Sequence, residues 1–414
     1  SAIKPTSPLM EILHILLIIL IATRLFGEIV KRFQFPVILG EIIAGVVLGL
    51  IIPFFSPQLP FLSDLANDEV FRAVTDLGVF FLMLYAGLEL HPDDFRKSSG
   101  TALWIAIGGM VIPLAFGLIT GIWLFPDSES KPALALFLGT VLAITAVPVA
   151  IRLLMDLGKL NSRAGKTIVS AAVIDDVISL LLLAVLTSFI ETQTMPGISD
   201  LLWILGKIVL FFGLTIAVGI YALPVVNELV FKNALVDEIE IGFLLIVAMA
   251  FAWLAEYLGM HFIMGAFIAG LFFMQRNLGE EVFKKVKAKI EGITAGFLAP
   301  VFFASIGLNM DLSAIPHIPG VILLLIGIAI AGKFIGTMIP ARWLGFSRED
   351  ILTIGFSMNA RGVVSIIIAD VALKAGLFNQ SGGDVIIDSL FSAVVIMAIT
   401  TTIITPIALR FILK

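Results

Sequence analysis

Residues 167–190 read TIVSAAVIDDVISLLLLAVLTSFI, an apolar run that carries two adjacent aspartates, Asp175 and Asp176, near its middle. A charged side chain near the centre of a bilayer costs about 2.5–3.5 kcal/mol even on the most lenient insertion scale. Acidic residues inside membrane spans are therefore rare, and most of them serve an ion or proton pathway. The pair predicts a site that handles a cation or a proton.

The rest of the chain has the composition of a polytopic membrane protein. Of its 414 residues, 59% are hydrophobic and only 14% are charged, whereas a soluble domain carries about 25% charged residues. The chain has no cysteine, which excludes disulfides and cysteine-based metal sites. Its net charge of −5 gives no sign of a nucleic-acid partner, and we expect no cofactor.

Apolar runs long enough to cross a bilayer alternate with polar or Pro- and Gly-containing breaks along the whole chain. They predict an all-α fold with thirteen transmembrane helices. The predicted ranges are 9–26, 36–54, 70–90, 101–125, 132–155, 165–190, 202–224, 239–258, 260–275, 292–310, 318–341, 349–373 and 385–412.

The basic residues of the loops predict the orientation of these helices. Eighteen of the 26 lysines and arginines fall in one set of alternate loops, and four fall in the other set. Because cytoplasmic loops are enriched in Lys and Arg, we expect the N-terminus outside and the C-terminus in the cytoplasm. The expected location is a plasma membrane, the inner membrane of a bacterium.

Two of the predicted helices are interrupted near mid-membrane. In the fifth, Pro148 lacks a backbone donor and disfavours helix at the residue before it, and Thr145 lies just upstream. The twelfth is interrupted by four polar residues and a glycine: Ser357, Asn359, Arg361, Gly362 and Ser365. Being seven helices apart, the two run in opposite directions, as in inverted-repeat transporters with a midplane site. We expect repeats of helices 1–6 and 8–13, linked by helix 7.

A lysine in the predicted eleventh helix offers a counter-charge for the aspartates. Lys333 lies inside the run 318–341 with small residues around it. The face around Asp175 is also small and includes Ser179 one turn later, and small residues allow helices to approach closely. We expect Lys333 to pair with the aspartates and to act as a proton-releasing switch; the alternatives are a static salt bridge and a snorkelling lysine.

Arg361 is a different kind of charge, because an arginine stays protonated at any physiological pH. We expect it to neutralise the carbonyl ends of the broken helices, or to pair with an acid. The candidate acids are Glu41, Glu89 and Asp156.

Three further features are weaker candidates. Glu89 with Asp93 and Asp94 fits a cytoplasmic cation funnel, but fits an ordinary solvated helix end better. The histidines His14 and His261 fit a buried or interfacial role better than pH sensing. The basic run 283–292, FKKVKAKIEG, is predicted as a cytoplasmic loop that binds a regulatory domain or anionic lipid, or that only sets the topology.

The chain resembles a known family through four features taken together. These are the aspartate pair, the sequence TAVP at 145–148, Lys333, and the sequence GAFIAGL at 265–271. They resemble the monovalent cation/proton antiporters, within the thirteen-helix branch of Nap-type sodium/proton and Kef-type potassium/proton antiporters. The resemblance covers essentially the whole chain.

The resemblance implies a secondary transporter rather than an enzyme, and a homodimer in the lipid bilayer. Residues 1–100 and 239–317 (helices 1–3 and 8–10) would form the dimerisation scaffold. Residues 101–190 and 318–414 (helices 4–6 and 11–13) would form an ion-transporting core that moves like an elevator, with 191–238 as a linker helix. Members of this family often carry a cytoplasmic nucleotide-binding domain after the last helix. Because this chain stops at Lys414, we expect that domain to be absent or removed, and a regulatory domain beyond Lys414 is a candidate partner.

The resemblance assigns roles to single residues. Asp176 would be the main cation ligand and Asp175 the partner of the lysine, while Thr145 and nearby backbone carbonyls complete the shell. The supporting residues would be Pro148, Ser179, Asn359 and Arg361. Kef-type members typically have Gln or another residue at position 175; the aspartate here favours Na+, with Li+ as a further substrate, and predicts an electrogenic cycle.

Exchange of Na+ for protons is therefore the predicted function. The alternative is a Kef-type K+/H+ antiporter or K+ efflux system, and a cation channel is remote because no filter-like repeat is present. We exclude an intramembrane aspartyl protease, since two adjacent residues of one helix cannot face each other across a substrate.

Overall fold

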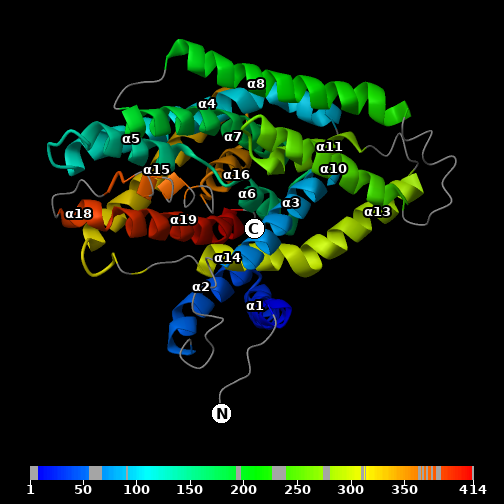
Figure 1. Cartoon of the computed structure of the whole chain (residues 1–414), viewed down its shortest axis with the longest axis horizontal. Helices are drawn as coiled ribbons and strands as arrows, with labels where there is room; N and C mark the ends of the chain where they lie inside the picture. Colours follow the sequence, from blue (N-terminus) through cyan, green and yellow to red (C-terminus); the bar gives the residue numbers. More distant parts are fainter. Residues whose placement is uncertain are drawn as a thin grey trace. The chain divides into compact units, whose positions relative to one another are not determined.

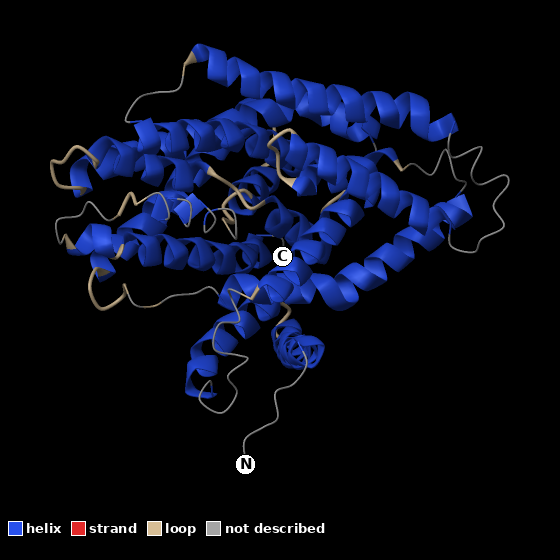
Figure 2. Ribbon diagram, in the orientation of Figure 1, coloured by secondary structure: helices blue, strands red, loops and turns tan. Residues whose placement is uncertain are grey.

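The computed structural model describes most of the chain, in segments. These are residues 8–55, 68–89, 92–192, 197–225, 239–273, 280–308, 312, 314–361, 365, 368–369, 372–373, 376–378 and 384–412. Every regular element in these segments is a helix (Figure 2). The predicted all-α class is confirmed.

The chain divides into two compact units, each made of two separate stretches of sequence. The first unit contains residues 1–94 and 206–309, and the second contains residues 95–205 and 310–414. The helix α8 (Ile198–Ala217), which continues as the π-helix η3 (Val218–Ala222), crosses the boundary at 205/206.

Besides η3 and the part of α8 that follows residue 205, the described part of the first unit contains eight complete helical elements, most of them labelled in Figure 1. They are α1 (Pro8–Arg32), α2 (Val37–Phe55), α3 (Glu69–Glu89), α10 (Ile239–Tyr257), α11 (Phe262–Phe272), α13 (Glu280–Ile293), the π-helix η4 (Thr294–Leu298) and α14 (Ala299–Leu308). Within this unit α11 packs on both α3 and α10, and α14 packs on α2 and α3.

The glycines of GAFIAGL explain the close packing of α11. A methyl group added at Gly265 would fall 2.2 Å from the backbone of Phe251 on α10, and one at Gly270 would fall 2.3 Å from the carbonyl oxygen of Leu84 on α3. Only a residue without a side chain allows the backbones to approach this closely. The motif therefore sets the spacing of three helices.

The second unit contains the two broken helices. Its elements are most of α4 (Pro92–Leu124), α5 (Lys131–Ala143), α6 (Val147–Asp156), α7 (Arg163–Thr192), α15 (Pro319–Trp343), α16 (Arg348–Ser357), α18 (Val385–Asp388) and α19 (Leu390–Ile412). Here α7 packs on α5, α6 and α16, and α15 packs on α5, α16 and α19. These contacts bring the aspartate pair on α7 and the lysine on α15 into one unit.

Nine helices among the described residues are long and apolar enough to cross a membrane, and two shorter apolar helices, Val37–Ile52 and Phe262–Phe272, accompany them. The membrane-embedded, multi-helical class is therefore confirmed, whereas the count of thirteen spans stays a prediction.

One predicted boundary is wrong by a wide margin. The basic run 283–292, predicted as a loop, is helical, and α13 continues through η4 into α14. The run is charged, but Val286 and Ile290 lie four residues apart and are both buried. This single apolar stripe keeps the segment helical against the rest of its unit.

Candidate functional site

The first break separates α5 from α6. Helix α5 ends at Ala143, residues 144 and 146 have extended backbone conformations, and α6 begins at Val147 with Pro148 in its first turn. Proline suits the first turn of a helix because the N–H it lacks would have no partner there. The last carbonyls of α5 are then left without partners inside their own helix.

The second break lies against the first. Helix α16 ends at Ser357, and the chain beyond it passes next to residues 145 and 146. The amide of Ala146 donates to the carbonyl of Ala360 at 2.7 Å, and the hydroxyl of Thr145 donates to the carbonyl of Met358 at 3.3 Å. Each interruption therefore supplies hydrogen-bond partners to the other in the interior of the unit, where lipid could not supply them.

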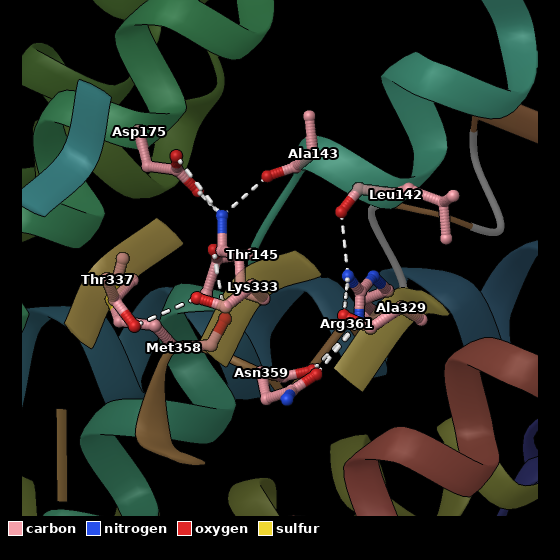
Figure 3. A network of polar contacts seen from close by, with 10 residues as sticks. All are labelled: Leu142, Ala143, Thr145, Asp175, Ala329, Lys333, Thr337, Met358, Asn359 and Arg361. Atoms are coloured by element: carbon pink, nitrogen blue, oxygen red, sulfur yellow. Dashed lines mark hydrogen bonds and ion pairs between the residues drawn. The ribbon is translucent and has the colours of Figure 1, made fainter. Parts of the chain in front are cut away.

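Lys333 places its ammonium group at this crossing (Figure 3). Its side chain is fully buried, and Nζ lies 3.2 Å from Oδ2 of Asp175, which is also fully buried. The same Nζ donates to the carbonyl of Ala143, the last residue of α5, at 2.5 Å. One ammonium thus binds a carboxylate and a free helix-end carbonyl, two oxygen ligands of the kind that a hard cation prefers.

Small residues make room for this lysine. On α15, Gly336 is so close to Gly108 of α4 that a methyl group added to either would fall 2.3 Å from the carbonyl oxygen of the other. At the next residue of α4, a methyl group added to Gly109 would lie 2.7 Å from the side chain of Thr337 and 3.8 Å from that of Lys333. The lysine therefore lies in a tightly packed helix crossing and points inward.

Arg361 is held by backbone oxygens rather than by an acid. Its Nη2 donates to the carbonyls of Leu142 at 2.7 Å and Ala329 at 3.0 Å, and its Nη1 donates to the carbonyl and to the side-chain oxygen of Asn359 (Figure 3). Asn359 in turn donates to the carbonyl of Ile330 at 3.2 Å.

Of the two alternatives for Arg361, its hydrogen bonds match the carbonyl ends rather than an acid. In the part of the chain that the structure describes, its hydrogen bonds involve none of the candidates Glu41, Glu89 and Asp156. Asp156 instead lies 3.1 Å from Arg152 on its own helix. A planar guanidinium can reach several carbonyls at once, which explains why an arginine suits this crossing.

Asp176 is the carboxylate that the site leaves open. Within the described residues its Oδ2 is buried and has no hydrogen-bond partner, and the same is true of Oγ of Ser179. The two residues are three positions apart on α7 and so lie on one face of it. Buried polar atoms without a partner are rare in proteins and call for an explanation. A bound cation, or a proton on the carboxylate, would supply the missing contact of Asp176.

Replacing Arg361 with alanine should destabilise the protein strongly. The carbonyls of Leu142 and Ala329 would lose charged hydrogen bonds in the buried interior of the unit, and such bonds contribute about 1.5–3 kcal/mol each. We expect the free energy of unfolding to fall by about 3 kcal/mol or more, measured by denaturation of the purified protein in detergent.

Arg163 offers a matched control for this measurement. It is exposed and also donates to two backbone carbonyls, those of Leu344 and Gly345 at the end of α15. Arg163→Ala should lower the unfolding free energy by less than about 1 kcal/mol. Equal losses in the two variants would show that Arg361 has no special part in holding the crossing.

The weaker candidates lie in the first unit or outside the described side chains. Glu89 accepts a hydrogen bond from Tyr85 at 2.7 Å and lies 2.8 Å from Lys287 of α13. His14 and His261 are exposed. The side chains of residues 93 and 94 lie outside the described residues.

The chain is similar over most of its length to one protein family and to several known proteins. A family of transmembrane proteins described as "Sodium/hydrogen exchanger" matches residues 15–414. The Na(+)/H(+)-K(+) antiporter GerN of Bacillus cereus is 34% identical over 394 residues, which are 95% of this chain and 94% of GerN. The Na(+)/H(+) antiporter NhaS4 of Synechocystis sp. is 32% identical, with 97% of this chain and 96% of NhaS4 covered.

A solved structure has the same fold at low sequence identity. The sodium proton antiporter MjNhaP1 from Methanocaldococcus jannaschii superposes with a TM-score of 0.67 at 18% identity, covering 98% of this chain and 99% of that protein. This similarity supports the fold alone.

Proposed function

Because the chain belongs to the sodium/hydrogen exchanger family of secondary transporters, we propose that it exchanges Na+, with Li+ as a further substrate, for protons at Asp175 and Asp176. The observation that carries this proposal is the buried, unpartnered Oδ2 of Asp176 beside an Asp175 that Lys333 already neutralises. Asp176 is open to a transported cation, whereas Asp175 is already paired with the ammonium group of Lys333.

Competition for the same oxygens would couple the two ions. A proton on the carboxylate of Asp176 removes the charge that attracts Na+, and a bound Na+ disfavours the proton. Na+ would be held by Asp176 with the hydroxyl of Thr145 and neighbouring carbonyls, and its arrival would displace Lys333 from Asp175. If Lys333 then releases its own proton, two protons move for each Na+ and the cycle transfers charge.

The proposed movement is an elevator-like displacement of one unit. Support comes from the division of the chain into two compact units and from the location of Thr145, Asp175, Asp176, Lys333 and Arg361 in only one of them. The unit with residues 95–205 and 310–414 would carry the ion, and the other would hold two copies together as a homodimer.

The proposed orientation rests on the loop charges alone. The segments between predicted spans that hold eighteen of the 26 basic residues, among them the helical run 283–292, would face the cytoplasm of a plasma membrane, with the N-terminus outside.

Exchange of K+ is the second candidate function. This candidate rests on the relative GerN, which is 34% identical to this chain and is described as a Na(+)/H(+)-K(+) antiporter. The aspartate at 175 remains the sequence feature that favours Na+.

One assay tests both candidates. Purified protein is reconstituted in liposomes that contain a pH dye, and Li+, Na+, K+ and Rb+ are added in turn at a clamped membrane voltage. We expect saturable dissipation of a pH gradient by Na+ and Li+. A stronger response to K+ or Rb+ would replace Na+ with K+ as the substrate, and a flux that does not saturate and cannot run against a gradient would indicate a channel.

A further inference from the structure

Three serine side chains in the second unit are buried without a hydrogen-bond partner. They are Ser179 on α7, Ser357 at the end of α16 and Ser365 just past the second break, and their exposed fractions are 7%, 0% and 0%. Among the described residues no group makes a hydrogen bond to their Oγ atoms. All three therefore belong to the two elements that carry Asp176 and Arg361.

A buried hydroxyl inside a helix commonly donates to a backbone carbonyl one turn earlier. This chain follows that rule at other positions. Thr140, Thr167 and Thr337 in the second unit and Ser305 in the first donate to carbonyls of their own helices at 2.7–2.9 Å. The three serines near the site are exceptions, and a buried hydroxyl without a partner indicates that something else contacts it.

Ser179 lies next to a carboxylate with the same missing contact. Residues three apart on a helix have Cβ atoms about 5–6 Å apart, and helical side chains lean toward the N-terminus of their helix. The hydroxyl of Ser179 therefore leans over the turn that carries Asp176. Asp176 as a whole residue is half-buried, as are Val177 and Ile178 beside it, so this face of α7 is not sealed.

The two oxygens leave space for one ion between them. Oδ2 of Asp176 and Oγ of Ser179 have no partner among the described residues, so they do not bond to each other. On adjacent turns of one face they are still close enough for one bound ion to contact both. The hydroxyl of Thr145, by contrast, already donates to the carbonyl of Met358.

We propose that Ser179 is a ligand of the transported alkali ion, which lies between its Oγ and Oδ2 of Asp176. This inference rests on the proposed function and adds a ligand to the shell of Asp176, Thr145 and neighbouring carbonyls. A hydroxyl is a hard oxygen donor, as an alkali ion prefers. Because serine neither carries charge nor takes up a proton at physiological pH, Ser179 contributes to cation affinity and takes no part in the exchange of protons.

Thermal unfolding of the full chain in detergent tests this ligand without any measurement of transport. Na+ is increased at alkaline pH, where protons do not compete, and choline keeps the ionic strength constant. A ligand that binds only the folded protein raises the unfolding temperature, so the half-saturating Na+ concentration reports the affinity. We expect Ser179→Ala to raise that concentration about fivefold, which corresponds to a net contribution of about 1 kcal/mol. Ser179→Thr keeps the hydroxyl and should stay within about twofold of the unmodified protein.

Ser305→Ala is the matched control. Ser305 is also 7% exposed, but its hydroxyl donates to the carbonyl of Phe302 at 2.7 Å in the first unit. The control should have the half-saturating concentration of the unmodified protein. An equal increase in Ser305→Ala or in Ser179→Thr would mean that packing rather than the hydroxyl matters, and would overturn the proposal.

Failure of this inference is distinguishable from failure of the proposed function. If Asp176→Asn abolishes the stabilisation by Na+ while Ser179→Ala leaves the half-saturating concentration unchanged, Ser179 is no ligand and the proposed function stands. If Na+, Li+, K+ and Rb+ all fail to stabilise the unmodified protein, both are overturned together. If Ser179→Ala does not fold, Ser179→Cys is measured instead, since its soft sulfur is a poor ligand for an alkali ion. A loss of about fivefold there supports the proposal, and no loss overturns it.

Discussion

Replacing Asp176 with asparagine is expected to abolish cation/proton exchange. Asparagine has nearly the same shape as aspartate, but it neither carries the negative charge that attracts a cation nor takes up and releases a proton. Removing one partner of a buried charge interaction costs about 3 kcal/mol or more, which corresponds to a loss of about 100-fold or greater in rate or affinity. The measurement is Na+-driven dissipation of a pH gradient in proteoliposomes.

The control for this variant is Asp127→Asn. Asp127 is an acid of the same type, but it is exposed in the loop before α5 and pairs with Lys131 at 2.7 Å. The control should transport at the rate of the unmodified protein. If Asp176→Asn retained more than a small fraction of that rate, Asp176 would have no part as the cation ligand.

Replacing Lys333 with glutamine should leave exchange active but remove its response to membrane voltage. Without the ammonium, the buried Asp175 loses the counter-charge that lies 3.2 Å away, and it stays protonated because an unpaired buried carboxylate is costly. One proton then moves for each Na+, so no net charge crosses the membrane. In the proposed two-proton cycle one net charge crosses the membrane, which is worth about 2.3 kcal/mol at 100 mV.

The readout is the Na+ gradient at which transport stops, measured at several clamped voltages. This gradient should shift with voltage in the unmodified protein and in Lys131→Gln, a surface lysine variant. It should not shift in Lys333→Gln. An unchanged voltage response in that variant would exclude the lysine as a proton carrier while leaving the role of Asp176 intact.

Local rules account for the features that the sequence predicts well. The break before α6 follows from one proline, because Pro148 acts on its own helix whatever packs around it. The proximity of Lys333 to Asp175 follows from the high cost of isolated charges in an apolar interior, which favours the approach of opposite charges on different helices.

The partners of Arg361 could not be predicted in the same way. Its acceptors are carbonyls of Leu142 and Ala329, and every residue has a carbonyl, so side-chain identity does not mark them. They are available at this place because α5 ends and α15 passes close by, which depends on tertiary packing. The sequence indicates only that the helix is interrupted, and an interrupted helix leaves some backbone carbonyls without a partner.

The helical extension of α13 escaped prediction for a different reason. Its charged surface is typical of a cytoplasmic loop, and that surface outweighed the apolar residues in the prediction. Val282, Val286, Ile290 and Ile293 recur at the spacing of one helix face, so the sequence does contain a helical signal. The burial of Val286 and Ile290 against the rest of the unit decides the conformation.

The lengths of the two half-helices have an electrical consequence. Helix α5 has 13 residues and α6 has 10, so they extend about 20 Å and 15 Å from the break. Neither half alone crosses a hydrocarbon core of about 30 Å, and the break lies well inside the field of the membrane. Any charge that reaches it from either surface crosses roughly half of the voltage drop, about 1.2 kcal/mol at 100 mV. Membrane voltage should therefore act on ion access as well as on the movement of the protein.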